Sequence, residues 1–500
     1  MKEKDNQVKP REATTFIAWL KFFPVFALAI LIIVFKLDLM VAAALACIVA
    51  GATVMYVNRS KVDDVVNIMV EAAGKITVVY LILMMAYCVA ESFMATGVGA
   101  SIINLSLRFG ISGQSVAPVG FLVTCVLSVA TGSSWGSFAA CAPVFLWLNY
   151  IVGGDIVLTA CAIAGGSCFG DNIGLISDTT VVSSGLNDVN VVDRVRHQGI
   201  WSLMCVAVSA VIFFLLSLDN PSLTGDPVAA INAIPPEAWA ALEIERPSAI
   251  LLLNQVRDGV PIYMIIPLIA VVVIAISGVS TMICLASGTF VSLIFGLIAK
   301  TVTVHSFLFD IIPNGFASAG SWSICMIMWI AAFGGLVSSM NAFDPIANFI
   351  VKHSSKVRHL LTWNALLCIF ANAAFADEMA EITTTTPITK AIIDNNVDAT
   401  EEQLYKLHLR NATLSDALGV YGSQLIPWHC YIVFYVALSN AIFPIYTFTP
   451  FDFIKSNVMA IVAVSSMVIL TFTGWDRFVP WFKIPSEPEV SLKKQIKSAE

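Results

Sequence analysis

Long apolar runs constrain this chain more than any other feature. The first of them, Phe16–Val34, is close to the ~20 residues that a helix needs to cross a bilayer. The chain is 58% hydrophobic and only 12% charged, well beyond the roughly 45–50% apolar content of soluble domains. Because the runs lack the weak alternation of a β-barrel, we predict an all-α polytopic membrane protein whose first run is an uncleaved helix.

A run of glycines and small hydroxyl residues, Thr131–Ser137, interrupts the apolar segment Val116–Tyr150. Non-helical backbone is tolerated at membrane depth only where protein or a polar cavity satisfies its N–H and C=O groups. Both arms are shorter than a full span, which predicts a re-entrant hairpin. The next segment, Ile156–Leu186, is interrupted at Gly170–Asn172 and continues through Ser177–Thr180. It predicts a helix broken inside the membrane.

The same order of segments recurs after the hydrophilic stretch Asp219–Val260. Each part begins with a tight pair of spans, followed by an amphipathic piece and a third span. In the second part the interrupted segment is Leu360–Ile393, and the broken helix is near Leu414–Leu438. We therefore predict an internal repeat of about five to six helices per half, each half with a re-entrant hairpin and a broken helix.

Two local matches support the repeat. Cys125 and Pro143 are paralleled by Cys368 and Pro387, and the stretch ending at Asp178 is paralleled by the stretch ending at Asp416. The other Cys residues also lie mostly in apolar segments, without CxxC or zinc-type spacing, so we expect small core residues there.

The positive charges predict the orientation of the chain. If the N-terminus is cytoplasmic, the outer loops carry only Lys36, Arg108, Arg246, Arg257, Lys300 and Lys455 among the 27 Lys and Arg. The first hairpin then enters from outside and the second from the cytoplasm, so the halves are inverted. We predict a cytoplasmic tail at 1–15, a first repeat at 16–218, an extracytoplasmic linker at 219–260, an inverted second repeat at 261–475 and a cytoplasmic tail at 476–500.

Two interrupted segments at matching places in inverted halves point to a transporter's binding site near the midplane. A partly dehydrated Na⁺ ion needs several oxygen ligands, which broken helices supply as free carbonyls beside small polar side chains. We expect the following residues to bind the ion or substrate: Ser133, Ser134, Asn172, Ser177, Thr179, Asp377 and Ser415. Ser133 and Asn172 of this set, and in addition Asp178, are the predicted Na⁺ ligands. The alternative is that such small polar residues only let helices approach closely.

Two carboxylates, Asp171 and Asp178, are candidates for exchanging Na⁺ against a proton. A carboxylate at membrane depth is costly unless it is paired or functional, and one carboxyl group can hold either ion. The competing interpretation is a salt bridge with Arg194 or Arg196 near the inner side.

The second half offers further acids whose roles the sequence leaves open. We expect Asp377 in the core and leave open whether Glu378 and Glu381 face water. Glu91, Asp416 and His429 have no assigned role, and a structural hydrogen bond is as good an explanation of His429 as titration near neutral pH.

An enzyme is an alternative because Gly132–Gly136 fits G-x-S-x-G, the pattern around a serine nucleophile. An intramembrane serine protease would need a histidine within reach of Ser134, and only His429 is expected inside the membrane. Hydrolysis also leaves the second interrupted segment unexplained. We therefore predict that the chain is not an enzyme.

The motifs Thr131–Ser137, Gly170–Thr180 and Leu425–Trp428 resemble the NhaC-type Na⁺/H⁺ antiporter family of the ion-transporter superfamily. The resemblance covers roughly residues 75 to 475. It implies an inverted-repeat fold with two re-entrant hairpins, Na⁺ coupling, a bacterial cytoplasmic membrane and commonly a homodimer, while the charge distribution predicts that both termini are cytoplasmic. Relatives in this superfamily move organic acids together with ions. The chain departs from the family pattern at Gly174, Asp416, Gly419, Val420 and His429, so the second half has drifted more than the first.

These observations predict a secondary transporter that exchanges Na⁺ for H⁺. The alternative is Na⁺-coupled transport of a small organic acid or amino acid, and the remote alternative is the protease. We expect Na⁺, H⁺ and the lipid bilayer as partners, no nucleic acid, and no cofactor besides the transported ions.

Overall fold

The structure is a computed structural model that describes residues 15–75, 77–175, 177–277, 279–320, 324–340 and 344–493. Among these residues almost all regular structure is helical, as predicted. The described strands, β1 (Val397–Asp398) and β2 (Ser491–Leu492), form one short antiparallel pair. Most of the predicted N-terminal tail, residues 1–14, and the end of the predicted C-terminal tail, residues 494–500, lie outside the described residues.

The helices of the first half follow the predicted segments, with one difference. They are α1 (Thr15–Ile33), α2 (Leu39–Asn58), α3 (Val62–Lys75), α4 (Thr77–Thr96), α5 (Val98–Arg108), α6 (Val116–Thr131), α7 (Ser134–Val152), α8 (Ile156–Ile173), α9 (Asp178–Leu186) and α10 (Val191–Leu216). The break predicted at Gly170–Asn172 is displaced, because α8 stays helical to Ile173 and is capped by Gly174. The connection between the halves holds α11 (Pro227–Asn232), α12 (Pro236–Glu245) and α13 (Pro247–Asp258).

The second half repeats this order. Its elements are η1 (Ile262–Ile265), α14 (Ile266–Ile276), α15 (Thr281–Ala299), α16 (Val304–Ser306), the π-helical η2 (Phe307–Ile311), α17 (Ile312–Ser318), α18 (Ile324–Ser339), α19 (Asp344–His353), α20 (Val357–Phe375), α21 (Glu378–Asn396), α22 (Glu401–Ser423), α23 (Cys430–Ile442), α24 (Pro450–Ser456), α25 (Val458–Thr473) and η4 (Trp475–Phe478).

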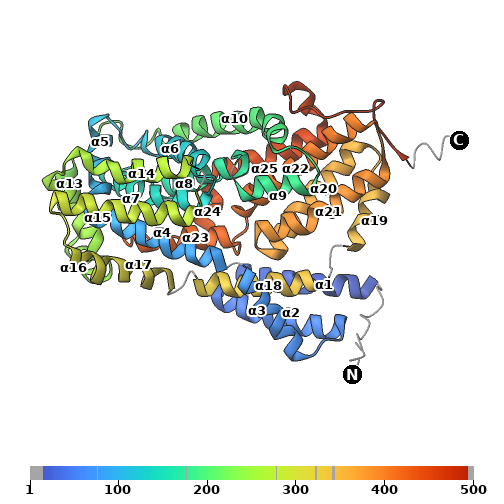
Figure 1. Cartoon of the computed structure of the whole chain (residues 1–500), viewed down its shortest axis with the longest axis horizontal. Helices are drawn as coiled ribbons and strands as arrows, with labels where there is room; N and C mark the ends of the chain where they lie inside the picture. Colours follow the sequence, from blue (N-terminus) through green and yellow to red (C-terminus); the bar gives the residue numbers. More distant parts are fainter. Residues whose placement is uncertain are drawn as a thin grey trace.

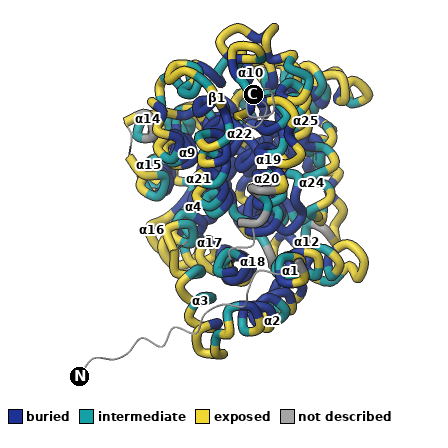
Figure 2. The backbone as a smooth tube through the Cα atoms, turned by 90° about the vertical axis from the view of Figure 1, so that its right-hand side faces the viewer, coloured by how far each residue is buried: buried dark blue, intermediate teal, exposed yellow. Residues whose placement is uncertain are grey.

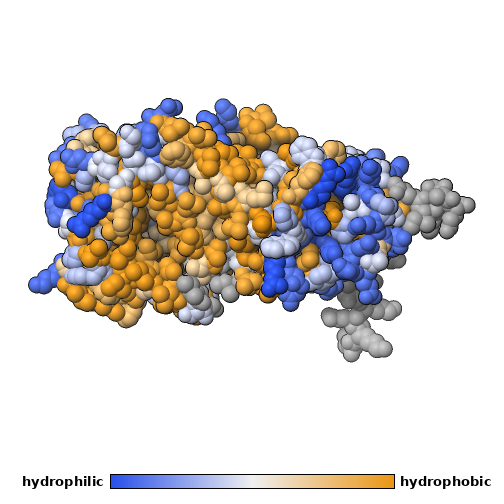
Figure 3. Space-filling view, turned by 90° about the horizontal axis from the view of Figure 1, so that it is seen from above, coloured by the Kyte–Doolittle hydropathy of each residue, from blue (hydrophilic) through white to orange (hydrophobic). Residues whose placement is uncertain are grey.

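Seven of the described helices are long and apolar enough to cross a membrane, and the bent pair α24–α25 could form an eighth span. Figure 3 shows a broad apolar band between two hydrophilic ends of the molecule. The connection helix α13 lies at one end of the long axis and the C-terminal segment at the other (Figure 1). The chain is therefore a polytopic membrane protein, as the apolar runs predict.

The two halves pack with reciprocal partners. Helix α2 packs against α18, and its counterpart α15 packs against α4, the counterpart of α18. In the same way α3 packs on α18 and α17 packs on α4, while α10 contacts α22 and α25 contacts α8. Two structurally similar halves exchange packing partners in this way when a twofold axis relates them. Buried backbone gathers around α20 and α22, and α2 and α3 lie at the periphery (Figure 2).

Two details differ from the sequence predictions. The arms of the first hairpin, α6 and α7, have 16 and 19 residues, and α7 is long enough to cross a membrane alone. The match between Asp178 and Asp416 is wrong, because Asp178 begins the second part of its broken helix whereas Asp416 lies within the first part of the other. The breaks themselves align Ser133 with Asp377, since each caps the second arm of its hairpin.

The connection between the halves and the C-terminal segment are both folded onto the helices. Helix α13 packs on α4 and α5 and buries Leu252 and Leu253. Phe482, in the segment that follows α25, contacts Arg410 of α22. The Arg410 guanidinium lies 3.8 Å from the centre of the Phe482 ring and donates to the backbone oxygen of Phe482. Residues 219–260 are therefore more than a linker, and the C-terminal segment covers one end of the second half.

Candidate functional site

Small residues bring α6 and α8 into close contact and so fix the position of the site. A Cβ atom at Gly170 would lie 2.0 Å from the carbonyl carbon of Ser128, and one at Gly166 would lie 2.6 Å from the oxygen of Phe121. The hydroxyl of Ser128 accepts from the Gly170 N–H at 3.0 Å and donates to the Ser167 oxygen. Glycines spaced four residues apart allow such close helix contacts in membranes. Asp171 is the next residue after Gly170, so the close contact between α6 and α8 also fixes its position.

The break of the first hairpin places Ser134 opposite α8. Helix α6 ends at Gly132, whose φ of 63° is in the left-handed region that glycine adopts freely. Ser133 is then extended and caps α7 by accepting from the Gly136 N–H. Ser134, the first residue of α7, is fully buried.

The carboxylate of Asp171 is surrounded by hydroxyl groups from three elements. Its Oδ2 accepts from Ser134 Oγ at 2.6 Å and from Tyr431 OH at 2.8 Å, and its Oδ1 accepts from Ser177 Oγ at 2.7 Å. Ser134 Oγ also lies 2.6 Å from Tyr431 OH. Ser134 belongs to the first hairpin, Ser177 to the break between α8 and α9, and Tyr431 to α23 of the second half. The site therefore joins both halves of the chain.

The backbone oxygen of Asp171 is engaged as well. It accepts from the hydroxyls of Thr179 and Thr180 at 3.2 and 3.1 Å, and Thr179 Oγ1 is 3.1 Å from Ser177 Oγ. The break in the helix leaves this oxygen without its usual partner four residues on, and the threonine side chains replace it. The predicted residues Ser134, Asp171, Ser177 and Thr179 are thus brought together.

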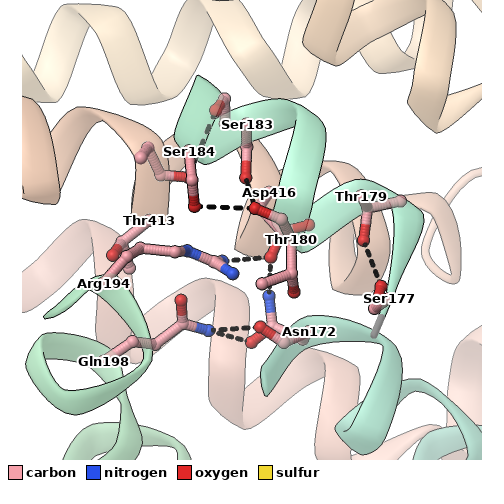
Figure 4. A network of polar contacts seen from close by, with 12 residues as sticks. Asn172, Ser177, Thr179, Thr180, Ser183, Ser184, Arg194, Gln198, Thr413 and Asp416 are labelled. Atoms are coloured by element: carbon pink, nitrogen blue, oxygen red, sulfur yellow. Dashed lines mark hydrogen bonds and ion pairs between the residues drawn. The ribbon is translucent and has the colours of Figure 1, made fainter. Parts of the chain in front are cut away.

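Asn172 connects this cluster to a buried ion pair. Its Nδ2 donates to Asp416 Oδ2 at 2.9 Å, and its Oδ1 accepts from Gln198 (Figure 4). Asp416 forms an ion pair with Arg194, and both side chains are fully buried. Nε and Nη1 of Arg194 have no hydrogen-bond partner among the described residues. The Arg194 guanidinium is therefore a buried positive charge with unused hydrogen-bond donors, and Asp416 and Asn172 connect it to the hydroxyl cluster around Asp171.

Several predicted residues lie outside this arrangement. Asp178 is exposed at the start of α9, and Ser415 bonds only within its own helix, to the Ala412 oxygen at 3.2 Å. Ser133 and Asp377 serve as helix caps; the half-buried Asp377 accepts from the Ala380 N–H at 2.7 Å. The structure thus separates the two candidate carboxylates, Asp171 and Asp178.

The acids left open in the second hairpin are buried, unlike Asp377. Glu381 is fully buried and accepts from the hydroxyl of Thr385 at 2.5 Å. A Cβ at Gly419 would lie 2.9 Å from Glu381 Oε2, so this carboxylate packs against the α22 backbone. Glu378 is 7% exposed and faces Cys430.

Two polar partners, Tyr431 and Gln198, are not among the residues predicted from the sequence, and Arg194, predicted as a possible partner of Asp171 or Asp178, pairs with Asp416 instead. Tyr431 stands in an apolar run, and its ring stacks on Trp135 with centroids 4.9 Å apart. Arg194 and Gln198 lie in the first turns of α10. A hydroxyl within an apolar helix, next to a break, is the signal that could have identified Tyr431.

The three residues without an assigned role now have contacts. Glu91 accepts from the hydroxyl of Ser248, which belongs to α13 of the connection. His429 Nε2 is 2.9 Å from Asn372 Oδ1, whereas the hydroxyl of Ser134 bonds to Asp171 and Tyr431. The structural hydrogen bond of His429 is therefore present, and the Ser134–His429 contact that a serine protease needs is not among these bonds.

Comparison with known proteins finds similar sequences among ion and solute antiporters. Residues 7–218 match the sequence model of the Na⁺/H⁺ antiporter family. The chain is 25% identical to the Na⁺/H⁺ antiporter NhaC of Alkalihalophilus pseudofirmus over 64% of its own length and 67% of the relative's. It is 22% identical to the malate-2H⁺/Na⁺-lactate antiporter of Bacillus subtilis, over 82% of this chain and 84% of that one. It is 23% identical to the arginine/ornithine antiporter ArcD of Halobacterium salinarum, over 86% and 84%. The resemblance seen in the motifs is confirmed.

Proposed function

We propose that this chain is a multi-pass secondary transporter that exchanges Na⁺ for H⁺ at Asp171, because residues 7–218 match the Na⁺/H⁺ antiporter family. The observation that carries the proposal is the buried carboxylate with hydroxyl groups from three elements around it. Each element is attached to a helix break, where a change of conformation can open the site.

The hydroxyl groups can stabilise Asp171 both when Na⁺ is absent and when Na⁺ is bound. A hydroxyl can donate its proton to the ionised carboxylate, or turn and offer a lone pair to a cation. Ser134, Ser177 and Tyr431 would then change from donors to Asp171 into ligands of Na⁺, together with the carboxylate itself. When Na⁺ leaves, a proton on the carboxylate removes the charge that burial disfavours. One group thus binds either ion, which makes binding of the two mutually exclusive.

The two carboxylates named from the sequence provide a matched test. In proteoliposomes that carry a pH-sensitive dye, an external Na⁺ pulse should change the internal pH with wild-type protein. We expect Asp171→Asn to abolish this response, because the side chain can no longer exchange a proton. Asp178→Asn should keep it, since that carboxylate is exposed and outside the cluster.

Either of two results would contradict this assignment. A wild-type response of Asp171→Asn would remove Asp171 from the exchange, and loss of the response in Asp178→Asn alone would return the role to Asp178. Uptake of radioactive Na⁺ by the same vesicles separates loss of Na⁺ binding from loss of proton coupling.

A second function is Na⁺-coupled transport of a small organic acid or amino acid. The relatives that align over more than four fifths of this chain are named as exchangers of organic solutes. Arg194, with two unbonded N–H groups beside Asn172, could receive a carboxylate of such a solute. If the dye response to Na⁺ appears only when malate, lactate, arginine or ornithine is added, this second function replaces the first.

The setting of the protein completes the proposal. We propose the bacterial cytoplasmic membrane, with both termini cytoplasmic and residues 219–260 outside, on the distribution of Lys and Arg. We also propose a homodimer, by analogy with the family. The transport function involves no enzymatic step and no cofactor besides the transported ions.

A further inference from the structure

Three metal-binding side chains of different chemistry meet beside the proposed exchange site. They are Glu378, the first residue of α21, His429, which caps α23, and Cys430, the first residue of α23. Their exposed fractions are 7%, 0% and 4%. One potential ligand atom from each lies within 4.8 Å of the other two. The first comes from the second hairpin and the others from the second broken helix, so the cluster bridges two separate breaks.

The hydrogen bonds orient His429 for metal binding. Both protons of Asn372 Nδ2 are used, by the Leu418 and Gly419 oxygens at 3.1 and 2.8 Å, so Asn372 Oδ1 is an acceptor. His429 Nε2, 2.9 Å away, must therefore carry the ring proton. The lone pair is then on Nδ1, which lies 3.6 Å from Cys430 Sγ; it accepts from the Tyr431 N–H at 3.2 Å, a helix-capping hydrogen bond that a metal ion at Nδ1 would replace. A ring N–H held by a side-chain oxygen is the usual support of a metal-binding histidine.

Two of the three ligand spacings fit a tetrahedral ion, and the Glu378–His429 spacing is within 4.8 Å. With bonds of about 2.0–2.3 Å, ligand atoms around Zn²⁺ are about 3.3–3.8 Å apart. Cys430 Sγ lies 3.6 Å from His429 Nδ1 and 3.8 Å from Glu378 Oε2. A thiolate, an imidazole and a carboxylate form a set that selects a zinc-like ion over Na⁺ or Mg²⁺, which prefer oxygen. Three protein ligands would leave one position for water.

We propose that Glu378, His429 and Cys430 bind one zinc-like divalent cation, and that its binding blocks exchange at Asp171. On binding, the Cys430 thiol releases its proton to solvent and the thiolate takes the metal. The ion ties the tip of the second hairpin to the start of α23. Tyr431, the next residue, donates to Asp171, so the same link restrains one wall of the exchange site. The widely spaced ligands explain why the sequence showed no zinc-type pattern.

Metal binding is tested on the full chain in detergent, independently of transport. After equilibrium dialysis against Zn²⁺, elemental analysis should find one ion per wild-type chain. Cys430→Ser and His429→Asn should each weaken binding at least ~10-fold. Cys205→Ser, which changes a buried cysteine outside the cluster, is the matched control and should bind as wild type does. Unchanged binding in Cys430→Ser, or no bound zinc in the wild type, would overturn the proposal.

A spectroscopic measurement on unaltered protein guards against variants that fail to fold. Co²⁺ in place of Zn²⁺ should give a thiolate-to-cobalt charge-transfer band, and its absence from the wild type would also refute the site. In proteoliposomes, Zn²⁺ should suppress the Na⁺-driven pH response of wild type and of Cys205→Ser, but leave that of Cys430→Ser. If zinc binds and the Na⁺ response persists, the blocking role is wrong even though the binding site stands.

Discussion

The hydroxyl of Tyr431 links the two halves of the chain at the proposed exchange site, and its removal tests the site most directly. Tyr431→Phe keeps the ring that stacks on Trp135 but removes contacts of 2.8 Å to Asp171 Oδ2 and 2.6 Å to Ser134 Oγ. A hydrogen bond to a charged group contributes about 1.5–3 kcal/mol. In the Na⁺-bound state this hydroxyl is proposed to become a ligand of the ion, so a loss of that size there, at about 1.4 kcal/mol per factor of ten, should raise the half-saturating Na⁺ concentration about 10- to 100-fold.

Tyr435→Phe is the control, because Tyr435 lies one turn further along α23 and is equally buried. Its hydroxyl contacts Ser167 Oγ at 3.0 Å and Cys168 Sγ at 3.4 Å, not the Asp171 carboxylate. The assay is the initial rate of the dye response in proteoliposomes over a range of Na⁺ concentrations, with equal amounts of reconstituted protein. The reasoning fails if Tyr431→Phe has the Na⁺ dependence of wild type, or if Tyr435→Phe shifts it equally.

Two further predictions concern the packing that holds the site. Gly170→Ala places a methyl group 2.0 Å from the α6 backbone and should lower the free energy of unfolding by more than the ~1–3 kcal/mol of ordinary overpacking. In Gly185→Ala the new methyl group meets nothing within 4 Å, so this variant should be neutral or more stable by up to ~1 kcal/mol. Thermal unfolding in detergent measures both variants. Asp416→Asn or Arg194→Met alone should each cost about 3–5 kcal/mol by leaving a buried charge unpaired. The double variant should recover much of that loss, and simple addition of the two costs would show that the pair is not coupled.

The helices and their breaks could be predicted because they depend on local sequence. Apolar length, the glycine at 132 and capping residues such as Ser133 act within a few residues of where they stand, whereas Gly170 acts through its contact with α6. The contacts between halves depend on how distant helices rotate, which no local pattern specifies. The Asp178–Asp416 match failed for this reason: it compared letters, whereas the breaks themselves show which positions correspond.

The site was predictable in part. Ser134, Asp171 and Ser177 were recognised because they stand at breaks, but the sequence could not choose between Asp171 and Asp178. Asp171 is in the last turn of α8 and faces the first hairpin, while Asp178 starts α9 on its exposed side. A break of a few residues resets the helical phase, so spacing along the chain no longer tells which side chains share a face.

The partners of Asp171 suggest how exchange avoids a leak. The carboxylate is held by the first hairpin, by the α8–α9 break and by α23, so motion of either half removes at least one donor. An ionised Asp171 that loses donors without gaining a cation becomes an unpaired buried charge, which costs several kcal/mol. A carboxylate that carries Na⁺ or a proton avoids that cost. On the proposed mechanism, the half-turnover with an empty, charged site is therefore the slow one, and the protein moves between two open states with Na⁺ or a proton bound to Asp171.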